Sequence, residues 1–123
     1  MSGEFSITNT TKSIQPQFRK NWSWVPFAKI KDAILGKDYC LSLVFIGQKK
    51  SKELNSKYRG KNRPTNVLSF PLDKKTGEIF ITPKLAGKEV GFLFIHGLLH
   101  LKGMRHSSTM ERLETKLRKQ FGV

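Results

Sequence analysis

The sequence has little cysteine, few acidic residues and no long hydrophobic run. Cys40 is the only cysteine, which excludes an intramolecular disulfide and is compatible with a reducing cytosol; we interpret it as a small buried hydrophobe. The longest apolar run, Val90 to Leu101, is shorter than the roughly 18 residues of a membrane span and indicates a buried core helix. Residues 1–5 lack the pattern of a secretory signal. We therefore expect a cytoplasmic protein without a membrane partner.

The scarcity of acidic residues leaves a large positive charge. There are 9 acidic residues against 23 lysines and arginines, so the formal net charge is +14. Such an excess destabilises a small protein by self-repulsion and is typical of a domain with a polyanionic partner, most commonly nucleic acid. A solvated surface without a partner is the alternative. The uneven distribution favours nucleic acid, because seven basic residues and one acid lie between positions 49 and 63.

This basic segment predicts a surface that binds the phosphates of a nucleic acid. Its members are Lys49, Lys50, Lys52, Lys57, Arg59, Lys61 and Arg63. Tyr58 lies among them and either stacks on a base or packs inward.

The order of strand-like and helix-like patterns predicts an α+β fold in a single layered domain, residues 1–123. We expect a small mixed sheet of about four strands, packed with about four or five helices around a central histidine-bearing helix. The predicted strands are one around Phe5 and Ile7, a central strand from Tyr39 to Ile46 that is covered on both faces, Val67–Phe70 ending at Pro71, and Glu78–Thr82.

The predicted helices begin and end at recognisable residues. They are one opened by Pro26 and stopped by Gly36, a short basic helix from Ser51 to Lys57 capped by Ser51, the apolar helix from Lys88 to Leu101, and a last helix that begins at the capping box Ser108–Glu111.

All three histidines lie within residues 96–106. On a helix, His96 and His100 lie one turn apart on the same face, and Gly103 allows the chain to fold back and bring His106 to the same ion. Three nitrogen ligands leave one position open, which is the arrangement of a catalytic rather than a structural zinc. The alternative is two core histidines and one on the surface. We favour the metal site because the spacing meets a geometric requirement of tetrahedral ligation.

The residue after His96 limits the chemistry. Zinc peptidases of the HExxH type have a glutamate there as general base, whereas this chain has Gly97. Peptide hydrolysis is therefore disfavoured.

Three motifs together resemble the bacterial YbeY family of endoribonucleases: the segment 54–71, the Gly77–Ile79 tripeptide and the histidine segment 96–106. The resemblance implies a single-strand-specific endoribonuclease in 16S rRNA 3′-end maturation and ribosome quality control. It also implies one zinc ion per chain and partners among single-stranded RNA, rRNA and ribosomal subunits, without DNA specificity.

The resemblance also implies roles for individual residues. His96, His100 and His106 match the metal ligands of the family, with His100 also counted as catalytic, and Arg59 matches the arginine proposed to act at the scissile phosphate. The chemistry agrees, because a guanidinium offers two parallel donors to the negative charge that develops on phosphoryl oxygens.

Several residues depart from the family pattern. Met104 and Arg105 precede the last histidine where the family usually has tyrosine and aspartate, and Ser107 follows where an acid is frequent. Asn66 and Glu78 stand where aspartate is common. The acidic neighbours of the last histidine are therefore missing, which predicts weaker metal binding or an altered metal preference, and we expect Arg105 to bind a substrate phosphate instead.

The alternative function is a ribosome-associated RNA-binding protein with a structural or vestigial metal site and no turnover. It predicts salt-sensitive RNA binding without cleavage, and a lower melting temperature on chelation.

Overall fold

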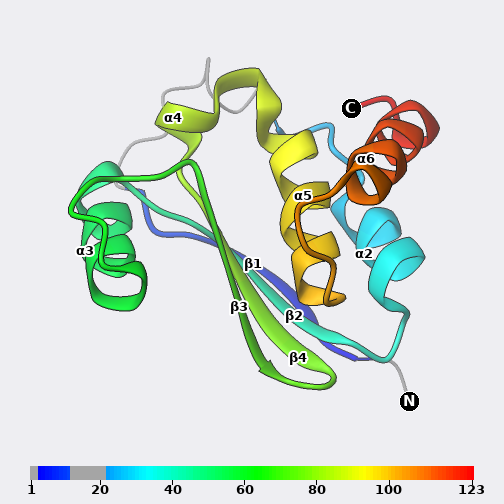
Figure 1. Ribbon diagram of the computed structural model, residues 1–123, viewed down its shortest axis with the longest axis horizontal. Helices are drawn as coiled ribbons and strands as arrows, with labels where there is room; N and C mark the ends of the chain where they lie inside the picture. Colours follow the sequence, from blue (N-terminus) through cyan, green and yellow to red (C-terminus); the bar gives the residue numbers. More distant parts are fainter. Residues whose placement is uncertain (1–2, 12–21) are drawn as a thin grey trace.

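The computed structural model describes residues 3–11 and 22–123. Figure 1 labels the helices and strands in chain order. Their bounds are β1 Phe5–Asn9, α2 Phe27–Leu35, β2 Cys40–Phe45, α3 Gln48–Arg59, β3 Val67–Asp73, β4 Thr76–Ile81, α4 Pro83–Ala86, the 3₁₀ turn η1 Gly87–Glu89, α5 Val90–Leu101 and α6 Ser108–Phe121. The predicted α+β class is confirmed. Within the described residues no helix is long and apolar enough to cross a membrane.

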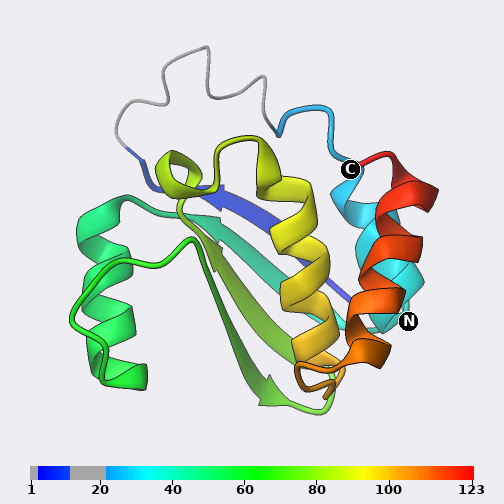
Figure 2. The same ribbon diagram turned by 45° about the horizontal axis from the view of Figure 1, so that its top comes forward.

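The four strands form one mixed sheet in the order β1-β2-β4-β3. β2 runs parallel to both β1 and β4, whereas β3 is antiparallel to β4 and occupies an edge. The sheet separates α3 from α5, as both views show (Figure 1, Figure 2). The predicted central position of the strand beginning near Tyr39 is thus confirmed.

The main core lies between the sheet and the helices α2, α5 and α6. α5 packs against β3 and β4 on one side and against α2 and α6 on the other, so the predicted central place of the histidine-bearing helix is confirmed. Gly97 lets α5 approach the sheet closely, because a Cβ atom there would lie 2.8 Å from Ser69 Oγ and 3.1 Å from Ile79 Cδ1. The residue after His96 therefore faces the sheet, which gives a packing reason for its being glycine.

The prediction that β2 is covered on both faces is wrong. Buried and half-buried residues alternate along β2, with Leu41, Leu43 and Phe45 in the core. Cys40 lies on the other face and is half-buried, so its predicted burial is also wrong. The period of two shows a strand with one face in the main core, and a continuous apolar run in the sequence does not distinguish the two cases.

Two predicted helix starts are also wrong. α3 begins at Gln48, and Ser51 lies inside it with its hydroxyl bonded to the backbone of Thr65 rather than capping the helix. α6 is capped by Ser107, one residue before the predicted cap Ser108, and Ser107 Oγ accepts a hydrogen bond from the Met110 amide. Neighbouring serines are chemically equivalent caps, so the sequence does not choose between them.

Proline does not end β3 as predicted. β3 continues through Pro71 to Asp73, and a register shift lies between these two residues. Pro71 is tolerated because β3 is an edge strand, in which amides that face away from β4 make no ladder hydrogen bond, and because bulges also accept proline. The following turn is correspondingly shorter than predicted, and β4 begins at Thr76.

Candidate metal centre and nucleic-acid interface

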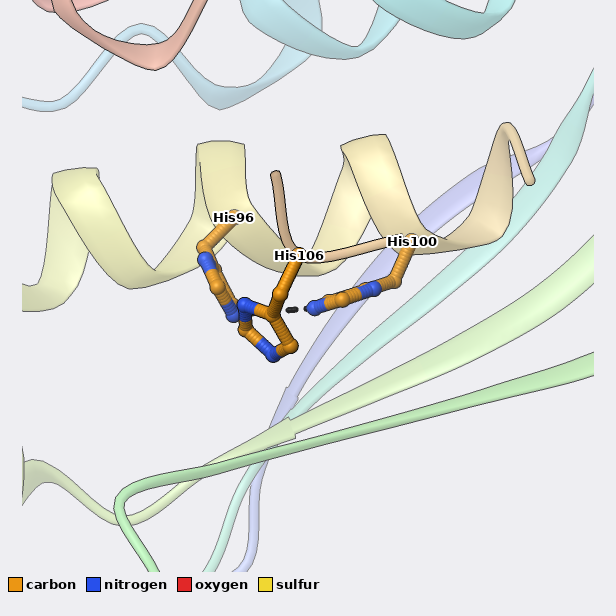
Figure 3. Close-up of side chains that lie close together, drawn as sticks. All are labelled: His96, His100 and His106. Atoms are coloured by element: carbon orange, nitrogen blue, oxygen red, sulfur yellow. Dashed lines mark hydrogen bonds between the residues drawn. The ribbon is translucent and has the colours of Figure 1, made fainter. Parts of the chain in front are cut away.

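The three histidines lie together at the C-terminal end of α5. Each offers a ring nitrogen, and these three atoms lie within 4.8 Å of one another. Their rings point toward a common space, with His106 approaching from the loop that follows the helix (Figure 3). Nε2 of His96 and Nε2 of His100 are 3.0 Å apart. The spacing within one helix face and the return of the chain thus place three imidazoles around one small volume.

Gly103 allows this return. Its φ of 101° lies in the region that side-chain-bearing residues rarely adopt. The amides of Gly103 and Met104 bond back to the carbonyl oxygens of His100 and Leu99, which satisfies the end of α5 while the chain reverses. The reversal brings the Met104 carbonyl oxygen to within 3.0 Å of His100 Nδ1.

Two of the imidazoles are oriented through their Nδ1 atoms. His96 Nδ1 lies 2.6 Å from Glu114 Oε1, and His100 Nδ1 donates to the Met104 carbonyl. With a proton on each Nδ1, both Nε2 atoms are acceptors that face each other across 3.0 Å. Two lone pairs at this distance repel unless a cation lies between them. The donor set therefore fits a metal ion. Two nitrogens that each lie about 2.0–2.1 Å from a tetrahedral zinc are roughly 3.4 Å apart, which is close to the 3.0 Å between these two Nε2 atoms.

The protonation of His100 suits metal binding. Burial, followed by the nearby His96 imidazole, lowers the pKa of His100 below its ordinary value of 6.5. The ring is therefore neutral at neutral pH, as a metal ligand must be.

The acidic sequence neighbours of His106 are missing, yet one carboxylate does lie beside the imidazoles, because Glu114 reaches His96 from α6. Glu114 lies one turn after Met110 on the buried face of α6, which also carries Leu117. A glutamate within an apolar helical stripe is a signal that sequence reasoning missed, since a buried carboxylate needs a partner. Its partner is the imidazole 18 residues earlier in the chain.

An open cleft of about 370 Å³ lies beside the histidines. His96 and His106 line it together with polar groups from the start of β3 and from α6, namely Asn66, Ser107, Glu111 and Glu114. Phe92 and Val67 contribute apolar walls. The candidate metal site is therefore accessible to a ligand from outside.

A second cleft of about 370 Å³ contains part of the basic segment. Arg59, Lys61 and Arg63 line it, and Asn66 lines both clefts, so the two are neighbours. Arg59 is the last residue of α3, and its positive charge contributes to the lowered pKa of His100. The structure thus places Arg59 on the same side of the molecule as the histidines, 37 residues away from His96 in the sequence.

The loop that carries Lys61 and Arg63 is fixed by the buried face of α3. Asn55 Nδ2 donates to the Arg63 carbonyl oxygen at 2.8 Å, and the Ser51 hydroxyl bonds both backbone groups of Thr65. Ser51 and Asn55 are buried although both are polar, because these bonds satisfy them. The polar face of α3 therefore holds a basic loop in place.

The other predicted nucleic-acid contacts lie outside the two clefts. Lys49, Lys50, Lys52 and Lys57 are exposed along α3, and Arg105 is exposed in the loop before His106. The Tyr58 ring packs against Phe70, with centroids 5.2 Å apart, and 57% of the residue stays exposed, so its inward packing leaves part of the ring accessible.

Comparisons with known proteins give one consistent result. The sequence profile of the family described as "Endoribonuclease YbeY" matches residues 5–122. A protein named Endoribonuclease YbeY from Thermodesulfovibrio yellowstonii is 39% identical over 101 residues, covering 63% of this chain and 64% of the relative. One of the same name from Bdellovibrio bacteriovorus is 29% identical and covers 98% of this chain and 89% of the relative.

A solved structure is also similar. The solution structure of a Thermotoga maritima protein matches with a TM-score of 0.58 and 26% identity, over 96% of this chain and 89% of that one. The chain spans slightly less than two thirds of the length of the Thermodesulfovibrio relative.

Proposed function

This chain belongs to the YbeY endoribonuclease family, and on that premise we propose that it is a zinc-dependent endoribonuclease that cuts single-stranded RNA. The observation that carries the proposal is the convergence of His96, His100 and His106 beside an open cleft. The adjoining cleft with Arg59 and two further cations supports RNA as the substrate.

His96, His100 and His106 would hold one zinc ion. The ion would supply Lewis-acid chemistry, polarising a phosphoryl oxygen and easing the ionisation of a water molecule. Glu114 and the Met104 carbonyl orient two of the imidazoles, which keeps their Nε2 atoms directed at the site before substrate arrives. His100 would act both as a metal ligand and as a catalytic residue.

Arg59 would stabilise the developing charge on the scissile phosphate. A guanidinium donates two parallel hydrogen bonds to a phosphate, and it stays protonated at every physiological pH. Arg59 is the last residue of α3, so the helix fixes the position of its backbone before charge develops.

The basic segment would bind the RNA on either side of the cut. Lys61 and Arg63 line the cleft with Arg59, and Lys49, Lys50, Lys52 and Lys57 extend the positive surface along α3. Arg105 is exposed and precedes His106 in the chain, and it would bind a phosphate near the metal. The family membership supports the 3′ end of 16S rRNA as the substrate, ribosomal subunits as partners, a cytoplasmic location and a single functional domain over residues 1–123.

Cleavage of end-labelled RNA by nuclease-free protein tests this function. We expect cleavage of a single-stranded substrate, little cleavage of the same sequence in a duplex, and loss of activity in both Arg59→Ala and His100→Ala. Lys116→Gln, an exposed substitution on α6, is the matched control. Retained cleavage in both active-site variants contradicts the proposal. RNA binding without cleavage, with a melting temperature that falls on chelation, would instead identify the binding protein with a structural metal.

A further inference from the structure

A third hollow lies on the face of the sheet opposite to α5. In β4, Ile79 is buried beside Gly97 of α5, so its neighbours Glu78 and Phe80 project from the other face. There they meet α3, and a hollow of about 290 Å³ forms between the helix and β3–β4. Its walls include Leu54, Tyr58, Phe70, Leu72, Glu78 and Phe80. No step of the reaction proposed above uses this hollow.

Aromatic rings shape the hollow and leave apolar surface in contact with water. The Tyr58 and Phe70 centroids are 5.2 Å apart with ring planes at 58°, and those of Phe70 and Phe80 are 5.8 Å apart at 67°. Tyr58 is 57% exposed and Leu72 is 59% exposed. A tilted, half-covered aromatic wall offers a stacking surface to a flat ligand.

The charges around the hollow match the two ends of a nucleotide. Glu78 brings the one carboxylate of its wall, and among the ion pairs of the described residues none involves Glu78. Lys57 Nζ lies 5.2 Å from the centre of the Tyr58 ring, at the rim. Lys50 lies one turn before Leu54 on the same side of α3. The Glu78 carboxylate inside the hollow can accept a hydrogen bond from the amino group of a base. The two lysines outside it can bind a phosphate of the same nucleotide.

We propose that this hollow binds one unpaired nucleobase that carries an exocyclic amino group, with Tyr58 stacking on the ring and Glu78 accepting from the amino group. Cytosine, adenine and guanine meet this description, whereas uracil has only a carbonyl at the corresponding position. The inference rests on the proposed ribonuclease function. It adds a specificity-determining site to that function.

The position of Tyr58 connects this site to the cleavage site. Tyr58 and Arg59 are consecutive residues in the last turn of α3, and their side chains leave the helix about 100° apart. One strand of RNA that curls around the end of α3 would therefore place a base in the hollow and a nearby phosphate at Arg59. The base read at Tyr58 would thus fix which phosphate is cut.

Binding of 12-nucleotide oligo(rC) and oligo(rU) to chelator-treated protein tests the inference. We expect the wild type to prefer oligo(rC), and Tyr58→Ala to weaken oligo(rC) binding about 5- to 150-fold, the range of one lost base stack. The slope of log affinity against log salt should stay unchanged, because no phosphate contact is lost. Tyr58→Phe, which keeps the ring, is the matched control and should bind like the wild type.

Glu78→Gln tests the amino-group contact separately. A glutamine amide donates to the O4 atom of uracil as well as accepting, so we expect the preference to shift from oligo(rC) toward oligo(rU). The inference would be overturned if Tyr58→Ala and Glu78→Gln bound RNA with unchanged affinity and base preference. If cleavage still depended on Arg59 in that case, the ribonuclease function would remain intact. Absence of any RNA binding or cleavage by the wild type would overturn both.

Discussion

Glu114 Oε1 lies 2.6 Å from His96 Nδ1, across the contact between α6 and α5. The Glu114 side chain is only 10% exposed, so its carboxylate depends on the His96 Nδ1–H group for a hydrogen bond. The contact leaves His96 Nε2 as the free acceptor and directs it toward His100 and His106. A carboxylate behind a ligand imidazole also raises its basicity, which strengthens metal binding.

Replacing Glu114 should therefore weaken the metal site without removing a ligand. We expect Glu114→Gln to bind zinc about 10- to 100-fold more weakly than the wild type, because the neutral amide orients the ring less well and adds no charge. Competition with a chromophoric chelator measures the affinity. Glu111→Gln, on the same helix and lining the same cleft, is the control and should bind zinc much as the wild type does. Equal zinc affinity in wild type and Glu114→Gln would contradict this role.

The lowered pKa of His100 predicts how the stability of the metal-free protein depends on pH. The unfolded chain takes up a proton on His100 near pH 6.5, whereas the folded chain does so only at lower pH. The unfolded state thus binds more protons in that interval, and the free energy of unfolding should fall as pH is lowered from about 7.5 through 6.5. Urea unfolding at a series of pH values measures this. His100→Gln should give a flatter profile, and a profile as steep as that of the wild type would refute the assignment.

The geometry of Arg59 predicts that charge alone does not suffice. Arg59→Lys keeps the positive charge but loses the paired donors, and we expect cleavage to slow by about 10²-fold or more while zinc affinity is unchanged. Single-turnover cleavage at saturating protein separates this effect from RNA affinity. The control is Arg112→Lys, an exposed position on α6. A single-turnover rate for Arg59→Lys close to that of the wild type would show that no bidentate contact is made in the transition state.

Gly97 predicts a packing effect that runs against helix propensity. Alanine is favoured over glycine in a helix by about 1 kcal/mol, yet the new Cβ would lie 2.8 Å from Ser69 Oγ. Crowding of this kind costs about 1–3 kcal/mol, so Gly97→Ala should lower the free energy of unfolding. Removing the hydroxyl in the double variant Ser69→Ala/Gly97→Ala should recover part of the loss in a double-mutant cycle. Greater stability of Gly97→Ala would show that α5 can shift away from the sheet.

Much of the fold follows from patterns that the sequence contains locally. The apolar run of α5, the alternation in β4 and the glycine ends of α2 and α5 depend on neighbours within a few residues. The errors arise where tertiary contacts decide. Ser51 bonds to Thr65 instead of capping α3, and Pro71 is accepted because β3 happens to be an edge strand. Neither the bond between Ser51 and Thr65 nor the edge position of β3 can be predicted from the local sequence.

The residues of the site likewise divide into those that local sequence predicts and those that tertiary packing brings in. The three histidines lie within 11 residues, so helix spacing and one glycine suffice to predict their convergence. Glu114 comes from a different helix, and only the packing of α6 on α5 brings it to His96. The proposed role of Arg59 rests on the family resemblance, since spacing along the chain does not place the end of α3 near the end of α5.

A zinc titration of RNA cleavage tests whether the three histidines hold one catalytic zinc ion. Chelator-stripped protein at micromolar concentration is given increasing zinc, and cleavage of a single-stranded RNA is followed at each step. We expect no cleavage without zinc and activity that saturates at one equivalent of zinc per chain. The His106→Gln variant should need far more zinc to reach any activity. Cleavage that is equally fast in the stripped protein, or in His106→Gln at one equivalent, would contradict this expectation.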